Sequence, residues 1–177
     1  MNIALSSDLI RLRAVEPHDA DIIYGWENNP DNWLVSSTLI PFSKYDIEQF
    51  VKGDRDIYVT RQLRLMIENM SNHNILGAVD LYDFEPYHRR AGIGILIAGE
   101  DNRKQGFASS AIKILTHYAF ETLLLKQLYC TIPSNNNASI RLFESLGFVL
   151  CAKKSQWLQT KDGWIDELTY QCINSSL

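Results

Sequence analysis

The most constraining stretch of the sequence is an apolar run that passes through a polar loop directly into a long helix. Segment 93–97 is rich in isoleucine and typical of a buried strand, and loop 99–105 is polar. After Gly106, apolar residues recur at helical spacing, which indicates a helix with one buried face. The residues on this face are Ala108, Ala111, Ile112, Leu115 and Ala119. A strand that leads into a helix N-terminus is typical of an α/β fold and brings free backbone amides together.

The start of this helix has the residue types of an anion-binding site. Arg103 and Lys104 add positive charge, and Gly106 lets a ligand approach the backbone without meeting a side chain. Free amides and the helix dipole favour phosphate at such a position. There is no GxxxxGK[ST] motif, and segment 92–94 lacks the third glycine of the dinucleotide fingerprint. An ordinary strand-loop-helix connection would contain the same residue types, so both interpretations stay open on this ground.

The rest of the sequence predicts strands and helices distributed along one domain, residues 1–177. A chain of 177 residues suits a single domain with a sizeable core. We expect helices that begin at Pro17, Ser43, Gly106 and Ser139, the second with Ile47, Phe50 and Val51 on its buried face. We expect strands at 10–13, 63–68, 75–84, 91–98, 127–132, 148–151, 156–160 and 164–173.

Composition and charge exclude several classes of protein. The 17 lysine and arginine residues against 21 acidic residues give a net charge of -4, which argues against a nucleic-acid partner and suits a cationic or neutral substrate. No basic segment precedes an apolar run at the start, and no apolar run is long enough to span a bilayer, so we expect a cytoplasmic protein with no membrane partner. Cys130, Cys151 and Cys172 form no CxxC pair and have no nearby histidine cluster, so no metal site is predicted.

Two motifs give the chain a family resemblance. Segment 103–108 resembles the (Q/R)xxGx(G/A) pattern with which GNAT superfamily enzymes bind the pyrophosphate of acetyl-CoA. Segments 136–139 and 142–148 are similar to the "N..S..L(Y/F)..LGF" helix of the same superfamily. The run 88–91 and the order of elements look most like the spermidine and diamine N-acetyltransferase branch, and the ribosomal-protein alanine N-acetyltransferases look similar too.

The resemblance implies both a fold and a cosubstrate. The fold would be α/β (α+β), with a mixed, mostly antiparallel sheet of about six or seven strands, splayed at the acetyl-CoA site, and about four flanking helices. Acetyl-CoA would be the cosubstrate, with no metal, and a backbone N–H in the splay would polarise its thioester carbonyl. The residues that the resemblance assigns to the cosubstrate are Ile95, Leu96, Ile97, Arg103, Lys104, Gln105, Gly106, Phe107, Ala108, Ser109, Asn136 and Phe143.

The catalytic side chains depart from the family pattern. A substrate ammonium, with a pKa of about 10.4, must lose a proton before it attacks the thioester. The branch often has an acidic residue directly after the run 88–91, but this chain has Gly92 there. The candidates for a base or water relay are Glu27, Tyr82 and Glu85, with Asp80 and Asp83 as further ones. Each of them also suits a surface or substrate-orienting role.

A second departure concerns the leaving thiolate. Many GNAT enzymes protonate it with a tyrosine, whose position here is Phe143. A thiol with a pKa of about 8.5 leaves without a dedicated acid, so this change is compatible with activity.

The sequence thus predicts an N-acetyltransferase that moves an acetyl group from acetyl-CoA to a primary amine by direct attack in a ternary complex. A polyamine or diamine is the favoured acceptor, because the branch resemblance and the acidic balance agree. Acetylation of a protein N-terminus is the alternative, and Gly92 with Phe143 motivates a third, a non-catalytic acyl-CoA-binding protein. By analogy we expect a homodimer or larger homo-oligomer. The acceptor, the base, the proton source and any effector near 28–54 stay open.

Overall fold

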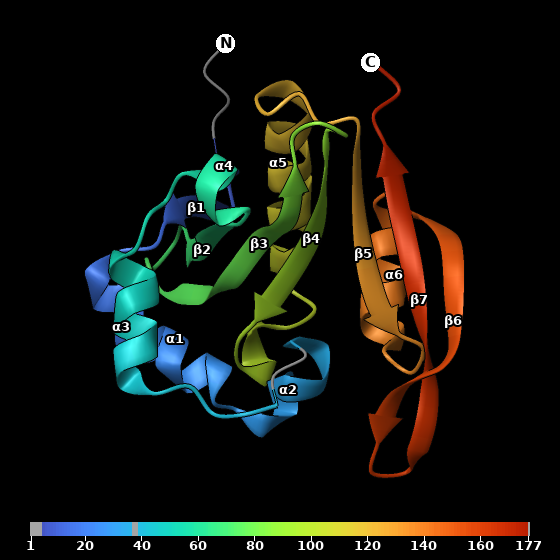
Figure 1. Ribbon diagram of the computed structural model, residues 1–177. Coiled ribbons are helices and arrows are strands. Elements are labelled where there is room, and N and C mark those ends of the chain that lie inside the picture. Colours follow the sequence, from blue (N-terminus) through green and yellow to red (C-terminus); the bar gives the residue numbers. More distant parts are fainter. Residues whose placement is uncertain (1–4, 37–38, 177) are drawn as a thin grey trace.

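The computed structural model describes residues 5–36 and 39–176, and its described strands form a single seven-stranded sheet (Figure 1). The order across the sheet is β1-β2-β3-β4-β5-β7-β6. Neighbouring strands are antiparallel except β4 and β5, which are parallel. The strands are β1 (Ile10–Ala14), β2 (Leu63–Asn69), β3 (Ile75–Glu85), β4 (Arg90–Ile97), β5 (Gln127–Pro133), β6 (Val149–Thr160) and β7 (Gly163–Ile173).

Helices cover both faces of this sheet. The α-helices of the described residues are α1 (Ala20–Glu27), α2 (Pro30–Ser36), α3 (Lys44–Lys52), α4 (Ile57–Thr60), α5 (Phe107–Glu121) and α6 (Asn137–Ser145), with 3-10 turns at Pro17–Asp19 and Glu100–Asn102. Leu81 and Ile93 belong to a core cluster with Leu115 of α5. On the opposite face, Ala78 belongs to a second cluster with Ile47 of α3. Because side chains alternate along a strand, β3 residues 78, 80 and 82 all lie on the face opposite α5.

The expected fold class is confirmed, with differences in its helices. Two short helices, α2 and α4, join the four expected ones; α2 starts at Pro30, since proline suits the first turn of a helix as well as a stop. Helix α6 begins two residues before the predicted Ser139, because the side chain of Asn136 caps it by accepting from the Ser139 amide at 3.1 Å. Phe50 of α3 is 40% exposed, so its predicted burial is wrong.

The C-terminal hairpin also differs from the prediction. The two short strands expected at 148–151 and 156–160 are one long strand, β6. Its register against β7 shifts between Leu150 and Ala152 and again between Lys154 and Leu158. The second irregularity lies where the sequence suggested a break, and the strand continues through it with a local interruption of the ladder.

The parallel strands β4 and β5 pair over only three positions. The partners are Arg90 with Gln127, Ala91 with Leu128, and Gly92 with Tyr129. Beyond these the strands diverge toward their C-terminal ends (Figure 1). We call this region, formed by residues 93–97 and 130–133, the β4–β5 splay, and its upper limit at Gly92 and Tyr129 the paired end. The splay predicted from the sequence is present.

Candidate active site at the β4–β5 splay

The loop that follows β4 presents free backbone amides at the N-terminus of α5. The loop is held by its own hydrogen bonds: Asn102 Nδ2 donates to the Ala98 carbonyl at 2.7 Å, and the Arg103 amide donates to the Glu100 carbonyl at 3.0 Å. Within the described part of the chain, the amides of residues 104–109 donate to no backbone carbonyl. These groups stand at the start of a helix of 15 residues, where an anion is favoured.

Two residues of this loop have left-handed backbone conformations. Lys104 has φ 60° and Gly106 has φ 85°. A Cβ at Gly106 would lie 3.8 Å from Leu9 Cδ1, which is ordinary contact, so backbone conformation rather than space favours glycine there.

The structure brings the predicted acetyl-CoA residues to the two sides of the splay. Ile95, Leu96 and Ile97 are half-buried on β4 and lead into loop 103–109. On the other side, β5 leads into Asn136 at the start of α6.

Two predicted cofactor residues have other structural roles as well. Phe143 is buried in the core and its ring meets that of Phe148 edge to face at 5.0 Å. The side chain of Phe107 is also buried, so only its backbone belongs to the loop surface.

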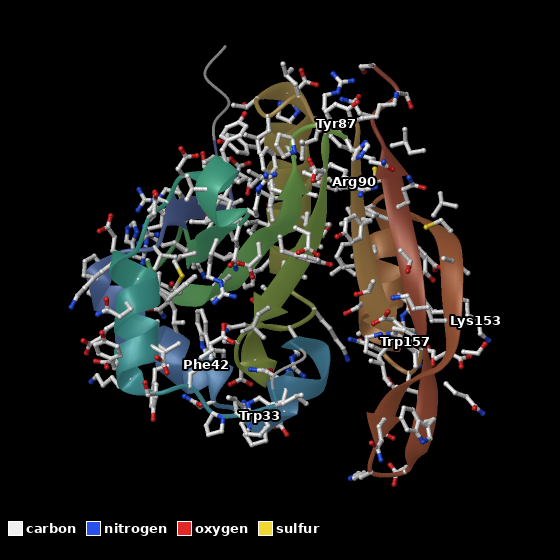
Figure 2. All side chains as sticks on the ribbon, in the orientation of Figure 1. Trp33, Phe42, Tyr87, Arg90, Lys153 and Trp157 are labelled. Carbon is white, nitrogen blue, oxygen red and sulfur yellow. The ribbon has the colours of Figure 1, made fainter. Side chains whose placement is uncertain are left out.

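The three candidate bases lie apart from one another. Glu27 ends α1 and its Oε1 accepts from Arg64 Nη1 at 2.6 Å. Glu85 pairs in register with Arg90, and its Oε1 accepts from the Tyr87 amide at 3.1 Å. Figure 2 shows Tyr87 and Arg90 at the upper end of β4, which is the paired end and not the open side of the splay. Tyr82 alone lies at the splay itself.

Tyr82 crosses over β4 from its place on β3. A Cβ on Gly92 would lie 2.1 Å from Tyr82 Cε2, and one on Gly94 would lie 3.6 Å from Cε1. The Tyr82 hydroxyl faces Thr131 on β5, whose side chain and backbone favour the ionised phenolate and so oppose the effect of burial on the pKa of Tyr82. Burial raises the pKa of Tyr82, chiefly by excluding water from the phenolate, which favours the protonated phenol.

A half-buried charge cluster lies in the next row of the same face. Arg64 of β2 binds Asp80 of β3 through two hydrogen bonds, 2.7 and 3.1 Å long, and binds Glu27 as well. All three side chains are 18% exposed. Burial raises the pKa of Asp80 despite the opposing effect of Arg64. Burial by itself would lower the pKa of Arg64, but Asp80 and then Glu27 outweigh it and raise it.

Two carboxylates thus share one guanidinium, which leaves an excess negative charge beside Gly94, the register partner of Asp80. The sequence analysis did not single out Arg64. The signal that was available is an arginine between Leu63 and Leu65 in a predicted strand.

A pocket of about 670 Å³ lies at the paired end of the splay. It brings together basic, acidic and amide side chains from four strands and the segment before β2. Its lining residues are Arg61, Asp83, Phe84, Glu85, Arg90, Gln127, Tyr129, Cys151 and Gln171.

The described residues contain neither a metal-binding cluster nor a membrane-spanning helix. Within 5–36 and 39–176, no three His, Cys, Asp or Glu side chains are grouped closely enough to hold a metal ion. No helix in the same ranges has the length and apolar character to cross a membrane.

The chain is similar in sequence to known acetyltransferases. It is 29% identical over 144 residues to the spermidine N(1)-acetyltransferase of Vibrio cholerae, covering 79% of each chain. It is 28% identical over 147 residues to the Escherichia coli K12 enzyme of the same name, covering 81% of this chain and 74% of that one. The ribosomal-protein-serine acetyltransferase of Escherichia coli K12 is 24% identical over 181 residues, with 96% of each chain covered.

Solved structures share the fold. The crystal structure of the Vibrio cholerae spermidine N-acetyltransferase in complex with CoA and spermine has a TM-score of 0.85 at 23% identity, covering 96% of this chain and 98% of that one. A dodecameric structure of the same enzyme has a TM-score of 0.78 at 22% identity, covering 96% of both chains. A family model described as an acetyltransferase (GNAT) domain matches residues 10–149, which is well over half of the chain. The protein therefore belongs to the GNAT family of acetyl-CoA-dependent N-acetyltransferases.

Proposed function

We propose that the chain transfers the acetyl group of acetyl-CoA to a primary amine by direct attack in a ternary complex, with a polyamine or diamine as acceptor. The observation that carries the proposal is the β4–β5 splay, which ends beside a loop of unpaired amides. The names of the two spermidine N(1)-acetyltransferase relatives support the choice of acceptor.

The residues around the splay fit the cosubstrate. The amides of residues 104–109, with the charges of Arg103 and Lys104, suit a pyrophosphate group. Beyond Gly92, the edge of β4 has no strand partner on the β5 side among the described residues, so its backbone groups can bind an amide-containing arm. When bound, acetyl-CoA supplies an acyl group activated as a thioester.

The acceptor approaches from the face opposite α5 in this proposal. Asp80 and Glu27 lie on that side and leave an excess negative charge beside Gly94, which favours an ammonium group. The raised pKa of Asp80 also brings it closer to the proton affinity that a base needs. Both carboxylates already accept hydrogen bonds from Arg64, which favours proton removal through a water rather than by direct contact.

The test is an assay of free-thiol release with acetyl-CoA and a panel of spermidine, spermine, putrescine, simple amines and N-terminal peptides. We expect release with polyamines, and a loss of about 100-fold in kcat/KM for Asp80→Asn, in the range that a proton-transfer group contributes. Glu85→Gln at the paired end is the matched control and should keep the wild-type rate. No thiol release with any acceptor of the panel, while acetyl-CoA still raises the melting temperature, would favour a binding protein without turnover.

Acetylation of a protein N-terminus is the second candidate. It is favoured by the similarity to the ribosomal-protein-serine acetyltransferase, which extends over 96% of the chain. Thiol release with peptides only, and none with polyamines, would establish it in place of the polyamine proposal.

We also propose that the protein forms a homo-oligomer through its C-terminal hairpin. Strand β6 is an edge strand, and it exposes large apolar residues: Val149 is 68% and Trp157 57% exposed. A structural relative is dodecameric. Light scattering should give a multiple of the 20.3 kDa chain mass, and a mass of one chain at micromolar concentration would contradict the proposal.

A further inference from the structure

We infer that Tyr82 closes the paired end of the β4–β5 splay and thereby limits the length of the acyl group that the site accepts. The inference rests on the proposed function, because it takes the splay as the place of the acyl arm. It concerns a residue on β3, one strand away from the splay.

The Tyr82 hydroxyl stands where the β4–β5 pairing ends. The last pair is Gly92 with Tyr129, and continuing the same register would bring Gly94 opposite Thr131. Instead, the ring of Tyr82 lies over Gly92 and Gly94, with its hydroxyl toward Thr131. The phenol therefore extends from β3 over β4 toward β5, at the level of the first positions that the two strands leave unpaired.

The ring has little freedom to move from this position. Below it are two glycines, and a Cβ at Gly92 would overlap the ring at 2.1 Å. Beside it lies the ring of Tyr129, edge to face with a centroid distance of 5.9 Å. The Tyr129 hydroxyl in turn donates to Asp83 Oδ2 at 3.2 Å, which fixes the neighbour. The Tyr82 ring is thus packed against the backbone of β4 and against the Tyr129 ring, which is itself held by a hydrogen bond. Such a ring is a rigid boundary.

The direction of the splay brings the acyl group to this boundary. The phosphate-binding loop follows the C-terminal end of β4, so it lies at the open end of the splay. A ligand held there by its phosphates and extended along β4 has its other end directed toward the paired end. The distance along the strand from Ile97 to Gly94 is about 10 Å at about 3.3 Å per residue. An acetyl group is the shortest acyl group with a carbon chain, and each further methylene brings it closer to the Tyr82 ring.

The test measures binding as well as turnover. Calorimetry gives the Kd of acetyl-CoA and of butyryl-CoA for the wild type, Tyr82→Phe, Tyr82→Leu and Tyr82→Ala. We expect the wild type to bind acetyl-CoA at least tenfold more tightly than butyryl-CoA, within the 10- to 200-fold range typical of a pocket that rejects an extra methylene. Tyr82→Leu and Tyr82→Ala should reduce this ratio about tenfold, whereas Tyr82→Phe, which keeps the ring, should retain it.

Three outcomes would overturn the inference or its basis, and they are distinguishable. An unchanged ratio in folded Tyr82→Leu would overturn it, and this variant is decisive if Tyr82→Ala does not fold. Loss of the ratio in Tyr82→Phe to the same extent as in Tyr82→Ala would show that the hydroxyl, and not the ring, forms the boundary. Failure of the wild type to bind either thioester would overturn the proposed function itself.

Discussion

The ring of Tyr82 occupies the space that any side chain at Gly92 would need. A Cβ at position 92 would lie 2.1 Å from Tyr82 Cε2 and 2.3 Å from Cζ. The two positions are therefore coupled: the glycine lets the ring cross β4, and the ring excludes a carboxylate at the place where the family branch often has one. The absence of an acidic residue at position 92 and the position of the Tyr82 ring therefore have the same structural cause.

The coupling predicts that Gly92→Ala destabilises the fold by about 1–3 kcal/mol, the usual cost of overpacking, because the ring must leave its place. Urea unfolding measures the change. Gly94→Ala is the matched control: its Cβ would lie 3.6 Å from Cε1, an ordinary contact, so we expect a change below about 1 kcal/mol. In the double variant with Tyr82→Ala the effect of Gly92→Ala should largely disappear. Simple additivity of the two substitutions would contradict the coupling.

Gly106 is predicted to be required for cosubstrate binding rather than for folding alone. Its φ of 85° costs a residue with a side chain about 1–2 kcal/mol, and relaxation of that strain would move the loop amides. We expect Gly106→Ala to weaken acetyl-CoA binding about tenfold, measured by calorimetry. Gly147→Ala has almost the same φ, 84°, at the opposite end of α6 from Asn136, and should lose similar stability with unchanged affinity. Equal affinity losses in both variants would point to a general loss of structure.

Removing Arg64 should leave two carboxylates in a partly buried place without the guanidinium that both of them bind. We expect Arg64→Gln to cost about 3 kcal/mol at pH 7, at the low end for a broken buried pair because the side chains are 18% exposed. The exposed pair of Lys52 and Glu48 is the control, and Lys52→Gln should change the free energy of unfolding by less than about 1 kcal/mol.

The same variant should also respond to pH. Burial raises the pKa of Asp80, and without Arg64 that rise is unopposed by its main partner. A group whose pKa is raised in the folded state binds protons more tightly there, so the deficit of Arg64→Gln should shrink between pH 7 and pH 5. A deficit that grows over this range would show that the carboxylates are not the cause.

The Glu68 carboxylate should contribute to the loss of stability at acid pH. Hydrogen bonds from Arg11 and then His73 lower its pKa to about 2. Stability from this group is complete above its unfolded pKa of about 4.3 and is lost as the pH falls toward about 2. Glu68→Gln should therefore have a flatter decline in melting temperature from pH 5 to pH 2. Asp162→Asn in the β6–β7 turn is the control and should keep the wild-type slope.

The positions of most helices and strands along the chain were predictable from the sequence. The alignment of the strands beside one another in the sheet was not. The loop and helix from Gly99 to Glu121 follow from local spacing, and Gly147 ends α6 with the expected left-handed conformation. Helix α2 was missed because Pro30 fits both the end of one helix and the start of the next. Phe50 was placed in the core by its spacing, but it is partly exposed and its ring lies 5.4 Å from the Arg64 guanidinium carbon.

The candidate site divides in the same way. Its backbone half, the splay and the loop amides, depends on the order of elements and was predicted through the motif. Its side-chain half depends on register: Tyr82 lies over Gly92 because β3 is beside β4, and Arg64 joins Glu27 to Asp80 across three elements. A single sequence gives spacing along the chain but not which rows of residues align across a sheet.

The three-residue ladder between β4 and β5 is a mechanically weak connection within the sheet. Strands β5, β7 and β6 connect to the other four through that ladder, while the core side chains against α5 continue across it. A molecule bound along β4 would supply hydrogen bonds that the ladder leaves out and would act as a splint between the two parts. Part of its binding free energy would then be used to restrict motion within the sheet. The protein without its cosubstrate should therefore be the more flexible form, even where its average structure is the same.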